Sequence, residues 1–314
     1  PGFRMLSTLA CIYASISLLT FFIPFFVKAL FWYPQDLKKK YDAKWGLVTG
    51  ASSGIGKAIA EKLLKQGIDV VLVALDDPTL KATKDELAKK YSDREIRVVG
   101  ANLAKDGYME TIAKATSDIH ISLVFNNAGF IRTSMFADLP VEQHLAIQEC
   151  NSTCAIRITH HFLNKLIDAK SKGFIAFTSS PAGQMPSPFA SMYGSTKAFL
   201  TEFGSSIAAE VRHKGIDVVV MHPSPVDSAF YANTHKISSI QMFQKTATGP
   251  DGIADYIFAG AGRTIVQEQG WFCVAVRGLL LKILDVALLA DIIARFVHFV
   301  PDFQKVQVER KKTN

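Results

Sequence analysis

Short runs rich in β-branched and aliphatic residues alternate with longer segments of helical periodicity from residue 45 to about residue 260. The runs carry Val, Ile, Leu and Phe at successive positions, which is typical of strands buried on both faces of a parallel sheet. The sequence therefore predicts an α/β fold with a doubly wound parallel sheet. The predicted strands are 45–49, 70–75, 96–101, 121–126, 174–179 and 217–222. Predicted helices include 55–66, 79–91 and 191–214.

The N-terminal segment has a different pattern, because no residue in 5–27 is charged. A helix of this length spans roughly 34 Å, enough to cross the hydrocarbon core of a bilayer. Pro24 is expected to kink or end that helix near its exit. Aromatic residues 31–33 and basic residues 38–40 follow it, as at a membrane interface. We predict an uncleaved transmembrane anchor. A cleaved signal peptide is the alternative, disfavoured by the long apolar run and the lack of an A-x-A motif.

The net charge of +7 is confined to the two ends of the chain. Residues 1–44 contribute +4 and residues 305–314 contribute +3, so residues 45–304 are neutral overall. A neutral body with basic ends does not suit a phosphate-binding groove, so we exclude nucleic acid and expect a membrane surface as partner. Because the basic cluster follows the apolar segment, the positive-inside rule predicts a folded domain that faces the cytosol.

The C-terminal tail and the cysteines both fit a cytosolic domain. Lys311 and Lys312 occupy the fourth and third positions from the end, as in a dilysine retrieval signal, which favours the endoplasmic reticulum membrane. The sequence starts with Pro, so Met5 is a candidate initiator. Cys150 and Cys154 lie one helical turn apart, but none of the 4 cysteines forms a C-x-x-C pair. We expect reduced thiols, with no disulfide framework and no metal site.

A glycine-rich loop joins the first predicted strand to the first predicted helix. It begins at Thr49 and has the spacing T-G-x-x-x-G-x-G. Gly50 permits a tight turn, Gly54 lets the backbone approach a pyrophosphate, and Gly56 allows close packing of the helix on the sheet. The helix N-terminus offers donors to phosphate. Because the loop lies between a strand and a helix, it predicts a Rossmann-type dinucleotide site.

Further motifs accompany this loop. Asn126-Asn127-Ala128-Gly129 follows the fourth strand, and Ser180 precedes the pair Tyr193-x-x-x-Lys197 by thirteen residues. Together these motifs resemble the short-chain dehydrogenase/reductase family over residues 45 to about 230. The resemblance implies an NAD(P)(H) cofactor and hydride transfer between a secondary alcohol and a ketone. An Asn on the central helix completes that family's catalytic set, and Asn151 matches it. The implied catalytic residues are Asn151, Ser180, Tyr193 and Lys197.

The chemistry of these residue types supports the same roles. Tyr193 and Lys197 are four residues apart, hence on one face of a helix. An ammonium beside a phenol is expected to lower the pKa of Tyr193 toward neutral pH. Tyr193 then exchanges a proton with the substrate oxygen, which Ser180 holds by a hydrogen bond. The resemblance implies that Lys197 also binds the nicotinamide ribose and that Asn151 holds a water that relays protons to Lys197. Ser179 is the alternative hydroxyl, disfavoured by the spacing.

The resemblance extends to the cofactor side with two departures. Pro223-Ser224-Pro225-Val226 replaces the Pro-Gly that often follows the sixth strand, and Asn102-Leu103 replaces Asp-Leu or Asp-Val at the adenine pocket. An Asn can still hydrogen-bond an adenine amino group. The expected cofactor-binding residues are Thr49, Gly50, Ser52, Ser53, Gly54, Ile55, Gly56, Asp76, Asn102, Leu103, Asn127, Ala128, Gly129, Tyr193, Lys197, Pro223 and Val226.

The end of the second strand leaves the choice between NAD and NADP open. Leu75 stands where NADP-binding relatives often have Arg, and Ala74 where NAD-binding relatives have an acid. Asp76 and Asp77 follow, and either carboxylate could reach a ribose hydroxyl and repel a 2′-phosphate. These residues favour NAD(H), whereas the family's membrane-bound reductases mostly use NADPH.

The anchor, the basic linker and the long C-terminal extension narrow the resemblance to the 3-oxoacyl-CoA reductases and hydroxysteroid dehydrogenases of the endoplasmic reticulum. We expect a lipophilic substrate, a 3-oxoacyl-CoA as first choice and a steroid as second. The segment 227–270 is expected to form an apolar lid over the substrate or a helix pair packed on the core. Its apolar residues include Phe230, Tyr231, Ile237, Ile240, Met242 and Phe243.

Residues 271–300 form a second apolar stretch, but its charged residues fall on about half of a helix circumference. This predicts an amphipathic helix that docks on the membrane surface or packs on the domain or a partner, instead of a second span. The predicted organisation is an anchor (1–34), a basic linker (35–44), a Rossmann domain (45–270) and an amphipathic extension (271–314).

Two inferences concern assembly and activity. The family resemblance implies a homodimer that pairs through helices 144–169 and 191–214. A nucleotide-binding scaffold subunit of a membrane complex is the alternative function, and the complete proton-transfer set disfavours it.

Overall fold

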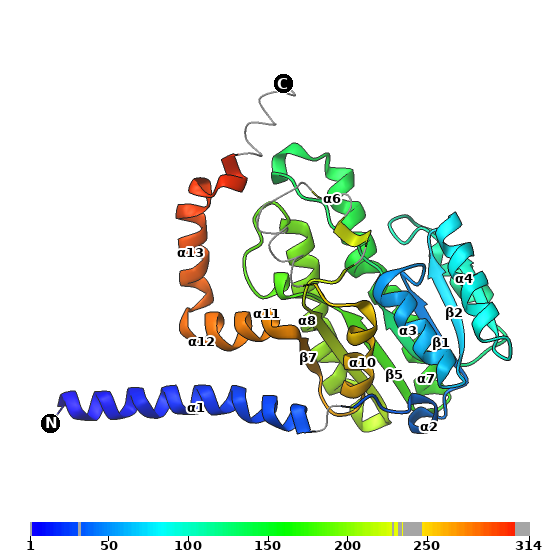
Figure 1. The fold of residues 1–314 in the computed structure, drawn as a ribbon, viewed down its shortest axis with the longest axis horizontal. Helices are drawn as coiled ribbons and strands as arrows, with labels where there is room; N and C mark the ends of the chain where they lie inside the picture. The colour runs from blue at the N-terminus through cyan, green and yellow to red at the C-terminus, as the bar shows by residue number, and fades with distance from the viewer. Residues whose placement is uncertain (1, 31–32, 228, 232–233, 235–246, 305–314) are drawn as a thin grey trace.

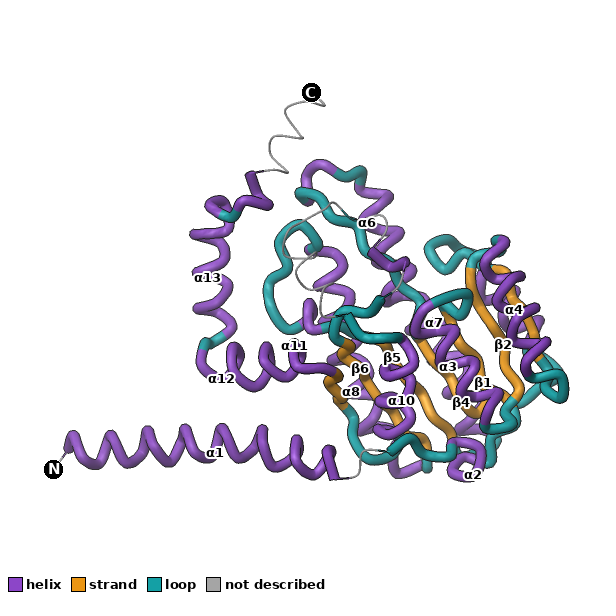
Figure 2. The backbone as a smooth tube through the Cα atoms, in the orientation of Figure 1, coloured by secondary structure: helices purple, strands orange, loops and turns teal. Residues whose placement is uncertain are grey.

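A parallel sheet forms the centre of the computed structural model, which describes residues 2–30, 33–227, 229–231, 234 and 247–304. Within these residues the sheet has seven strands in the order β3-β2-β1-β4-β5-β6-β7 (Figures 1 and 2). The strand order reverses between β1 and β4, which is where doubly wound folds bind ligands. The strands are β1 (Trp45–Thr49), β2 (Asp69–Ala74), β3 (Ile96–Gly100), β4 (Ile121–Asn126), β5 (Gly173–Thr178), β6 (Ile216–Pro223) and β7 (Val266–Gln269).

This architecture confirms the predicted doubly wound α/β fold. Each predicted strand agrees with an observed one to within one residue at either end. The sequence did not predict β7, because Val-Gln-Glu-Gln lacks an apolar run. Its Gln267 and Gln269 are nevertheless buried, and β7 pairs with β6 from Val220 to Pro223. Hydrogen bonds to the neighbouring strand and side chains thus offset the cost of burying these amides.

Helices cover both faces of the sheet and enclose two apolar cores. On one face lie α3 (Gly54–Lys65), α4 (Pro78–Lys90) and α10 (Pro250–Gly260), around the fully buried Phe125. On the other lie α5 (Tyr108–Ala115), α7 (Cys154–Asp168) and α8 (Ser191–Val211), around Phe177. Two further helices are α2 (Leu37–Tyr41) and α6 (Val141–Gln148). Short 3-10 turns lie at Phe136–Asp138, Pro181–Gly183, Arg212–Lys214, Ala229–Tyr231 and Val297–Phe299.

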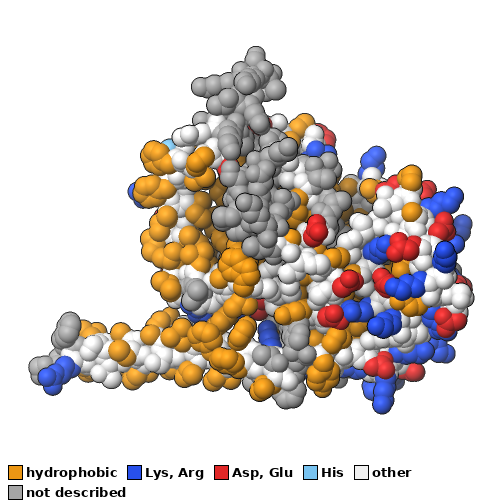
Figure 3. All heavy atoms as spheres, in the orientation of Figure 1, with side chains coloured by type: hydrophobic (Ala, Val, Ile, Leu, Met, Phe, Trp, Pro, Cys, Tyr) orange, Lys and Arg blue, Asp and Glu red, His pale blue; other side chains and the backbone are white. Residues whose placement is uncertain are grey.

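The helix α1 (Gly2–Leu30) projects away from the domain (Figure 1). Its segment Arg4–Ile23 is long and apolar enough to cross a membrane, and almost none of it is buried. Of the two outcomes expected at Pro24, a kink or an end, the helix does not end there but continues to Leu30. A proline removes a single backbone hydrogen bond, a loss that a long helix tolerates. Figure 3 shows apolar side chains along α1 and the C-terminal helices, whereas charged side chains gather over α3 and α4.

The C-terminal end of α1 contacts β7, the edge strand of the sheet. Lys28 Nζ donates to the carbonyl of Val266 at 2.8 Å and lies 3.6 Å from Glu268 Oε2. Arg277 pairs with the other oxygen of the same carboxylate. Glu268, only 9% exposed at its side chain, therefore has two cationic partners from elements on either side of it in sequence. Helix α1 and the C-terminal extension thus meet at β7.

The C-terminal extension is broken into pieces, where the sequence indicated a single amphipathic helix. It comprises α11 (Gly270–Ala275), a π-helical turn (Val276–Leu280), α12 (Leu281–Ile283) and α13 (Val286–Phe296). The break follows from Asp285, whose carboxylate accepts hydrogen bonds from the amides of Ala287 and Leu288 and so starts α13 as a new helix. Outside the described residues lie Ile237, Ile240, Met242 and Phe243 of the expected lid, residues 31–32, and the dilysine tail.

Candidate active site

The glycine-rich loop adopts the tight turn that its sequence predicts. Gly50 follows β1 with φ +64° and donates its amide to the carbonyl of Val73 at 2.8 Å. A Cβ on Gly56 would overlap the carbonyl of Gly50, so only glycine permits this approach of α3 to the loop. The loop backbone is therefore held at the carboxyl end of β1 and close to the first turn of α3.

The first turn of α3 fits a phosphate group. Ser53 precedes α3 in an extended conformation, and its hydroxyl makes no capping hydrogen bond to the helix. The amides of the first turn, from Gly54 onward, thus lack a side-chain cap, and they are the donors that a helix N-terminus offers to an anion. Ser52, Ile55 and Gly56 complete this turn, with Ser52 held through its carbonyl by the Thr83 hydroxyl at 2.7 Å. The residues expected to bind a pyrophosphate are therefore gathered at one place.

Thr49 and Asn127 join the ends of three neighbouring strands. The Thr49 hydroxyl accepts from the amides of Asn127 and Ala128 at 2.9 and 3.0 Å. Asn127 donates through Nδ2 to the carbonyl of Thr49 at 3.2 Å and accepts from the Thr178 hydroxyl at 3.0 Å. The carboxyl ends of β1, β4 and β5 are thereby locked together below the expected nicotinamide position.

Ser180, Tyr193 and Lys197 lie together beyond the ends of β5 and at the start of α8. The Ser180 hydroxyl lies beside the Tyr193 phenol, where it acts to lower the pKa of that phenol. Lys197 is 3% exposed, its Nζ donates to the carbonyl of Thr178 at 2.6 Å, and it lies 5.6 Å from the centre of the Tyr193 ring. The carbonyl of Thr178 therefore fixes the ammonium that faces the tyrosine.

Asn151 is brought to the same cluster by a local irregularity in the chain. It lies in a π-helical turn, Glu149–Thr153, between α6 and α7, and it is 1% exposed. Its side chain accepts from the amide of Phe130 and donates to the carbonyl of Phe130, both at 2.9 Å. Gly129 lets it approach, because a Cβ there would lie 3.1 Å from Asn151 Oδ1 and 3.4 Å from Lys197 Nζ. The four expected catalytic residues thus converge.

Burial dominates the electrostatics of this cluster. It lowers the pKa of Lys197 from 10.5 to about 8. It also raises the pKa of Tyr193, assisted by the neighbouring Tyr231, while the hydrogen bond from Ser180 acts in the opposite direction. The expectation that Lys197 lowers the pKa of Tyr193 toward neutral pH is therefore wrong for this form of the protein. The Tyr193 phenol is protonated at neutral pH.

A polar network behind the cluster was not recognised from the sequence. Ser179, the alternative hydroxyl, is buried and bonds to the Lys197 carbonyl at 2.6 Å and the Thr201 hydroxyl at 2.8 Å, so it faces the core of α8. His222 lies 2.9 Å from Thr201 Oγ1 through Nε2 and 2.7 Å from Gln184 Nε2 through Nδ1. Burial lowers the pKa of His222 to about 4. A His directly before the expected nicotinamide loop was the only available signal.

The remaining cofactor-side residues lie along the carboxyl edge of the sheet. Asp76 follows β2 and packs across Gly100, where a Cβ would lie 3.2 Å from the Asp76 carboxylate. Asn102 is exposed and accepts from the amide of Ala104 at 3.0 Å, whereas Leu103 is buried. Pro223 ends β6, and the buried Val226 forms an isolated bridge with Thr248.

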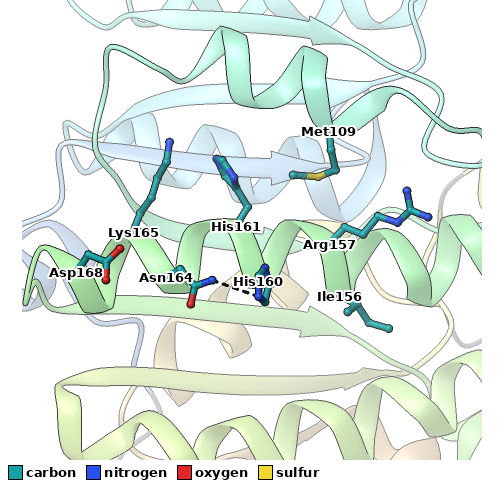
Figure 4. Close-up of a pocket in the computed structure, with 8 residues that line it drawn as sticks. All are labelled: Met109, Ile156, Arg157, His160, His161, Asn164, Lys165 and Asp168. Atoms are coloured by element: carbon teal, nitrogen blue, oxygen red, sulfur yellow. Dashed lines mark hydrogen bonds between the residues drawn. The ribbon is translucent and has the colours of Figure 1, made fainter.

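The surface hollow drawn in Figure 4 belongs to a different part of the molecule. Side chains of α7 project into it, Met109 of α5 borders it, and His160 Nε2 lies 3.3 Å from Asn164 Nδ2. None of the expected catalytic or cofactor-binding residues lines this hollow. Among the described residues, no group of three or more His, Cys, Asp or Glu side chains could hold a metal ion.

The doubly wound sheet and the glycine loop are typical of dinucleotide-dependent oxidoreductases, and the buried cluster of Asn151, Ser180, Tyr193 and Lys197 lies where such an enzyme is expected to have its active site. The family model described as short chain dehydrogenase matches residues 44–237. The chain belongs to this family, and it is an NAD(P)-dependent dehydrogenase/reductase.

Named relatives fall into three groups. A 7beta-hydroxysteroid dehydrogenase of Collinsella aerofaciens is 28% identical over 75% of this chain and 89% of its own length. The human 17-beta-hydroxysteroid dehydrogenase type 3 is 32% identical over 62% of this chain and 64% of its own. A very-long-chain 3-oxoacyl-CoA reductase of Laccaria bicolor is 29% identical over 73% of this chain and 67% of its own length. Among solved structures, a short-chain dehydrogenase from Sphingobium yanoikuyae in complex with NADPH is 25% identical and superposes with a TM-score of 0.67. The match covers 75% of this chain and 91% of that protein.

Proposed function

We propose that this protein interconverts a ketone and a secondary alcohol on a lipophilic substrate, with Asn151, Ser180, Tyr193 and Lys197 as its catalytic residues. The position of Ser180 and Tyr193 beside the buried Lys197 ammonium carries the proposal. Relatives named for hydroxysteroids and for very-long-chain 3-oxoacyl-CoA support a lipophilic ketone. A 3-oxoacyl-CoA is the first choice of substrate and an oxosteroid the second.

The cluster suits reduction of a carbonyl group. The hydroxyls of Ser180 and Tyr193 both donate hydrogen bonds to the carbonyl oxygen, which polarises the C=O bond. A nicotinamide held beside Asn127 and Lys197 would supply the hydride for the carbonyl carbon. As negative charge develops on the oxygen, Tyr193 transfers its proton there, and the ketone becomes an alcohol. The Lys197 ammonium, still mostly charged at pH 7 with its pKa of about 8, stabilises the phenolate that remains.

We propose NAD(H) as the preferred cofactor. The Asp76 carboxylate lies at the ends of β2 and β3, where an adenine ribose is expected. Leu75, in the position of the usual arginine, is 53% exposed and offers no charge to a 2′-phosphate. Lys57, the basic residue that follows the glycine loop, is paired with Glu86 at 2.6 Å. A titration that found equal affinity for NADH and NADPH would refute this preference.

We propose that α1 anchors the protein in the endoplasmic reticulum membrane and that the catalytic domain faces the cytosol. Support comes from the apolar, exposed segment Arg4–Ile23, the basic residues after it and the dilysine tail. The boundaries 1–34, 35–44, 45–270 and 271–314 remain our prediction for the organisation. Protease protection of sealed microsomes tests the orientation, since a cytosolic domain is digested without detergent.

We also propose a homodimer that pairs through α7 and α8, as the family resemblance implies. The outer face of α7 carries the hollow of Figure 4, whose exposed side chains include Ile156. Light scattering of the detergent-solubilised protein would report twice the protomer mass. A monomer at micromolar concentration would contradict the proposal.

The function is tested by following the absorbance of reduced nicotinamide with full-length protein in detergent. NADH is offered with a long-chain 3-oxoacyl-CoA and, separately, with a 17-oxosteroid. Turnover of either supports a lipophilic ketone and selects between the two substrate classes. Cofactor binding without turnover of either would contradict the proposal and favour a nucleotide-binding scaffold.

A further inference from the structure

The C-terminal extension, residues 270–304, returns to the catalytic domain at its far end. It leaves the sheet at β7, where Arg277 pairs with Glu268. After α13 it comes back to the domain, and the ring of Phe303 lies 5.7 Å from that of Phe189 at an angle of 59°. The neighbouring Asp302 is 4% exposed. The extension is therefore held at both ends, with α12 and α13 between them.

Phe189 belongs to the loop that connects the two hydroxyls of the candidate active site. This loop runs from Ser180 to Tyr193, and Phe189 lies four residues before the tyrosine. Two contacts hold the loop: the Phe189 carbonyl accepts from the amide of Ser134 at 2.8 Å, and the Ser187 hydroxyl donates to the carbonyl of Ala182 at 2.9 Å. These contacts hold Phe189 within the loop that leads to Tyr193.

The backbone of Phe189 is strained. Its φ of +66° lies in the left-handed region, which a bulky aromatic residue rarely adopts. Strain of this kind persists where the surrounding structure imposes it, and it clusters at ligand sites. Here the strained conformation presents an aromatic ring to Phe303, and both rings are only partly buried. An apolar surface therefore remains open on this pair.

We propose that Phe303 and Phe189 form an apolar wall of the substrate site, so that the C-terminal extension contributes a binding residue for the hydrocarbon part of the substrate. The inference rests on the proposed function, since it assumes a lipophilic ketone at Ser180 and Tyr193. A third aromatic side chain lies at the tyrosine itself, since the Phe230 ring is 5.7 Å from the Tyr193 ring. Phe189 reaches the same site through the chain, four residues before Tyr193.

Phe299 provides a matched control on the same extension. It lies four residues before Phe303 and is 66% exposed, and its ring contacts Phe296 and His298 of the same segment. Replacing either phenylalanine by alanine removes the same number of atoms from the same segment. Only the loss of Phe303 removes a contact with the Ser180–Tyr193 loop.

The test uses the full-length protein in detergent and 3-oxoacyl-CoA substrates of long and short chain. Phe303→Ala is expected to raise KM for the long chain about tenfold, because an apolar contact is lost. KM for the short chain and the affinity for NADH are expected to stay at wild-type values, and Phe303→Leu to restore most of the long-chain KM. A long-chain KM as in Phe299→Ala overturns the proposal, and so does an equal rise for both chain lengths.

Hydrogen exchange separates this inference from the proposed function. Phe303→Ala is expected to increase amide exchange in residues 184–190 relative to Phe299→Ala, whatever the substrate is. If wild-type protein reduces neither lipid, the proposed function fails, and the exchange measurement still decides whether Phe303 holds the loop. Unchanged exchange in that case overturns the inference as well.

Discussion

Replacing Lys197 by Met is expected to make the protein more stable while abolishing its activity. Burial lowers the pKa of Lys197 from 10.5 to about 8, so the charged form costs about 3 kcal/mol in the folded state. The variant removes that cost, but it also leaves the carbonyl of Thr178 without its donor, a loss of about 1–2 kcal/mol. The net expectation is a gain of about 1–2 kcal/mol at pH 7, with a melting temperature a few degrees higher.

The pH dependence of the stability provides a second test of this prediction. Because the folded pKa lies below the unfolded one, wild-type stability rises with pH between about 8 and 10.5, and Lys197→Met lacks that rise. Thermal unfolding at pH 7 and pH 9 measures both effects, and Lys89→Met, which changes an exposed lysine of α4, is the control. Turnover should fall by about 10² to 10⁴. A variant that is less stable than wild type at pH 7 would refute the reasoning.

Three further predictions follow from single contacts. The pKa of His222 is about 4 in the folded protein and 6.5 in the unfolded chain, so wild type loses about 2 kcal/mol of stability as the pH falls from 7 to 5. His222→Gln should lack this loss, which denaturant titration at the two pH values measures. Gly56→Ala should weaken NADH binding more than about tenfold in a fluorescence titration, because its Cβ would overlap the carbonyl of Gly50. A wild-type affinity would contradict the role of the loop. Asp76→Ala should improve the affinity for NADPH relative to NADH about tenfold, since a like charge near the 2′-phosphate is removed, and an unchanged ratio would show that Asp76 does not face the ribose.

The parallel sheet was predictable because its strands are buried on both faces and read as continuous apolar runs. The same criterion could not predict β7, since this short edge strand with two buried glutamines has no apolar run. The break at Asp285 was equally hidden, because the helical pattern continues on both sides of an N-cap residue. The pattern of apolar residues thus predicted the strands and helices that form the core. It did not predict the elements whose positions depend on hydrogen bonds.

The candidate site shows a similar division. The resemblance of the motifs to a known family brought Ser180, Tyr193 and Lys197 into one group, and the structure places them together. Spacing could not reveal that Asn151 lies in a π-helical turn, nor that burial raises the pKa of Tyr193. Both depend on the surroundings of a side chain, which only the folded chain determines. The same holds for Phe189 and Phe303, which lie far apart in sequence and meet in the fold.

The hydroxyl of Tyr193 decides whether this protein is a working reductase. Tyr193→Phe removes that hydroxyl and keeps the ring, so NADH should bind as in wild type while turnover of the long-chain 3-oxoacyl-CoA or the oxosteroid falls by about 10² to 10⁴. The measurement is NADH oxidation by both proteins at equal cofactor occupancy. Turnover by Tyr193→Phe at the wild-type rate would contradict the proton-transfer role on which the proposed function depends.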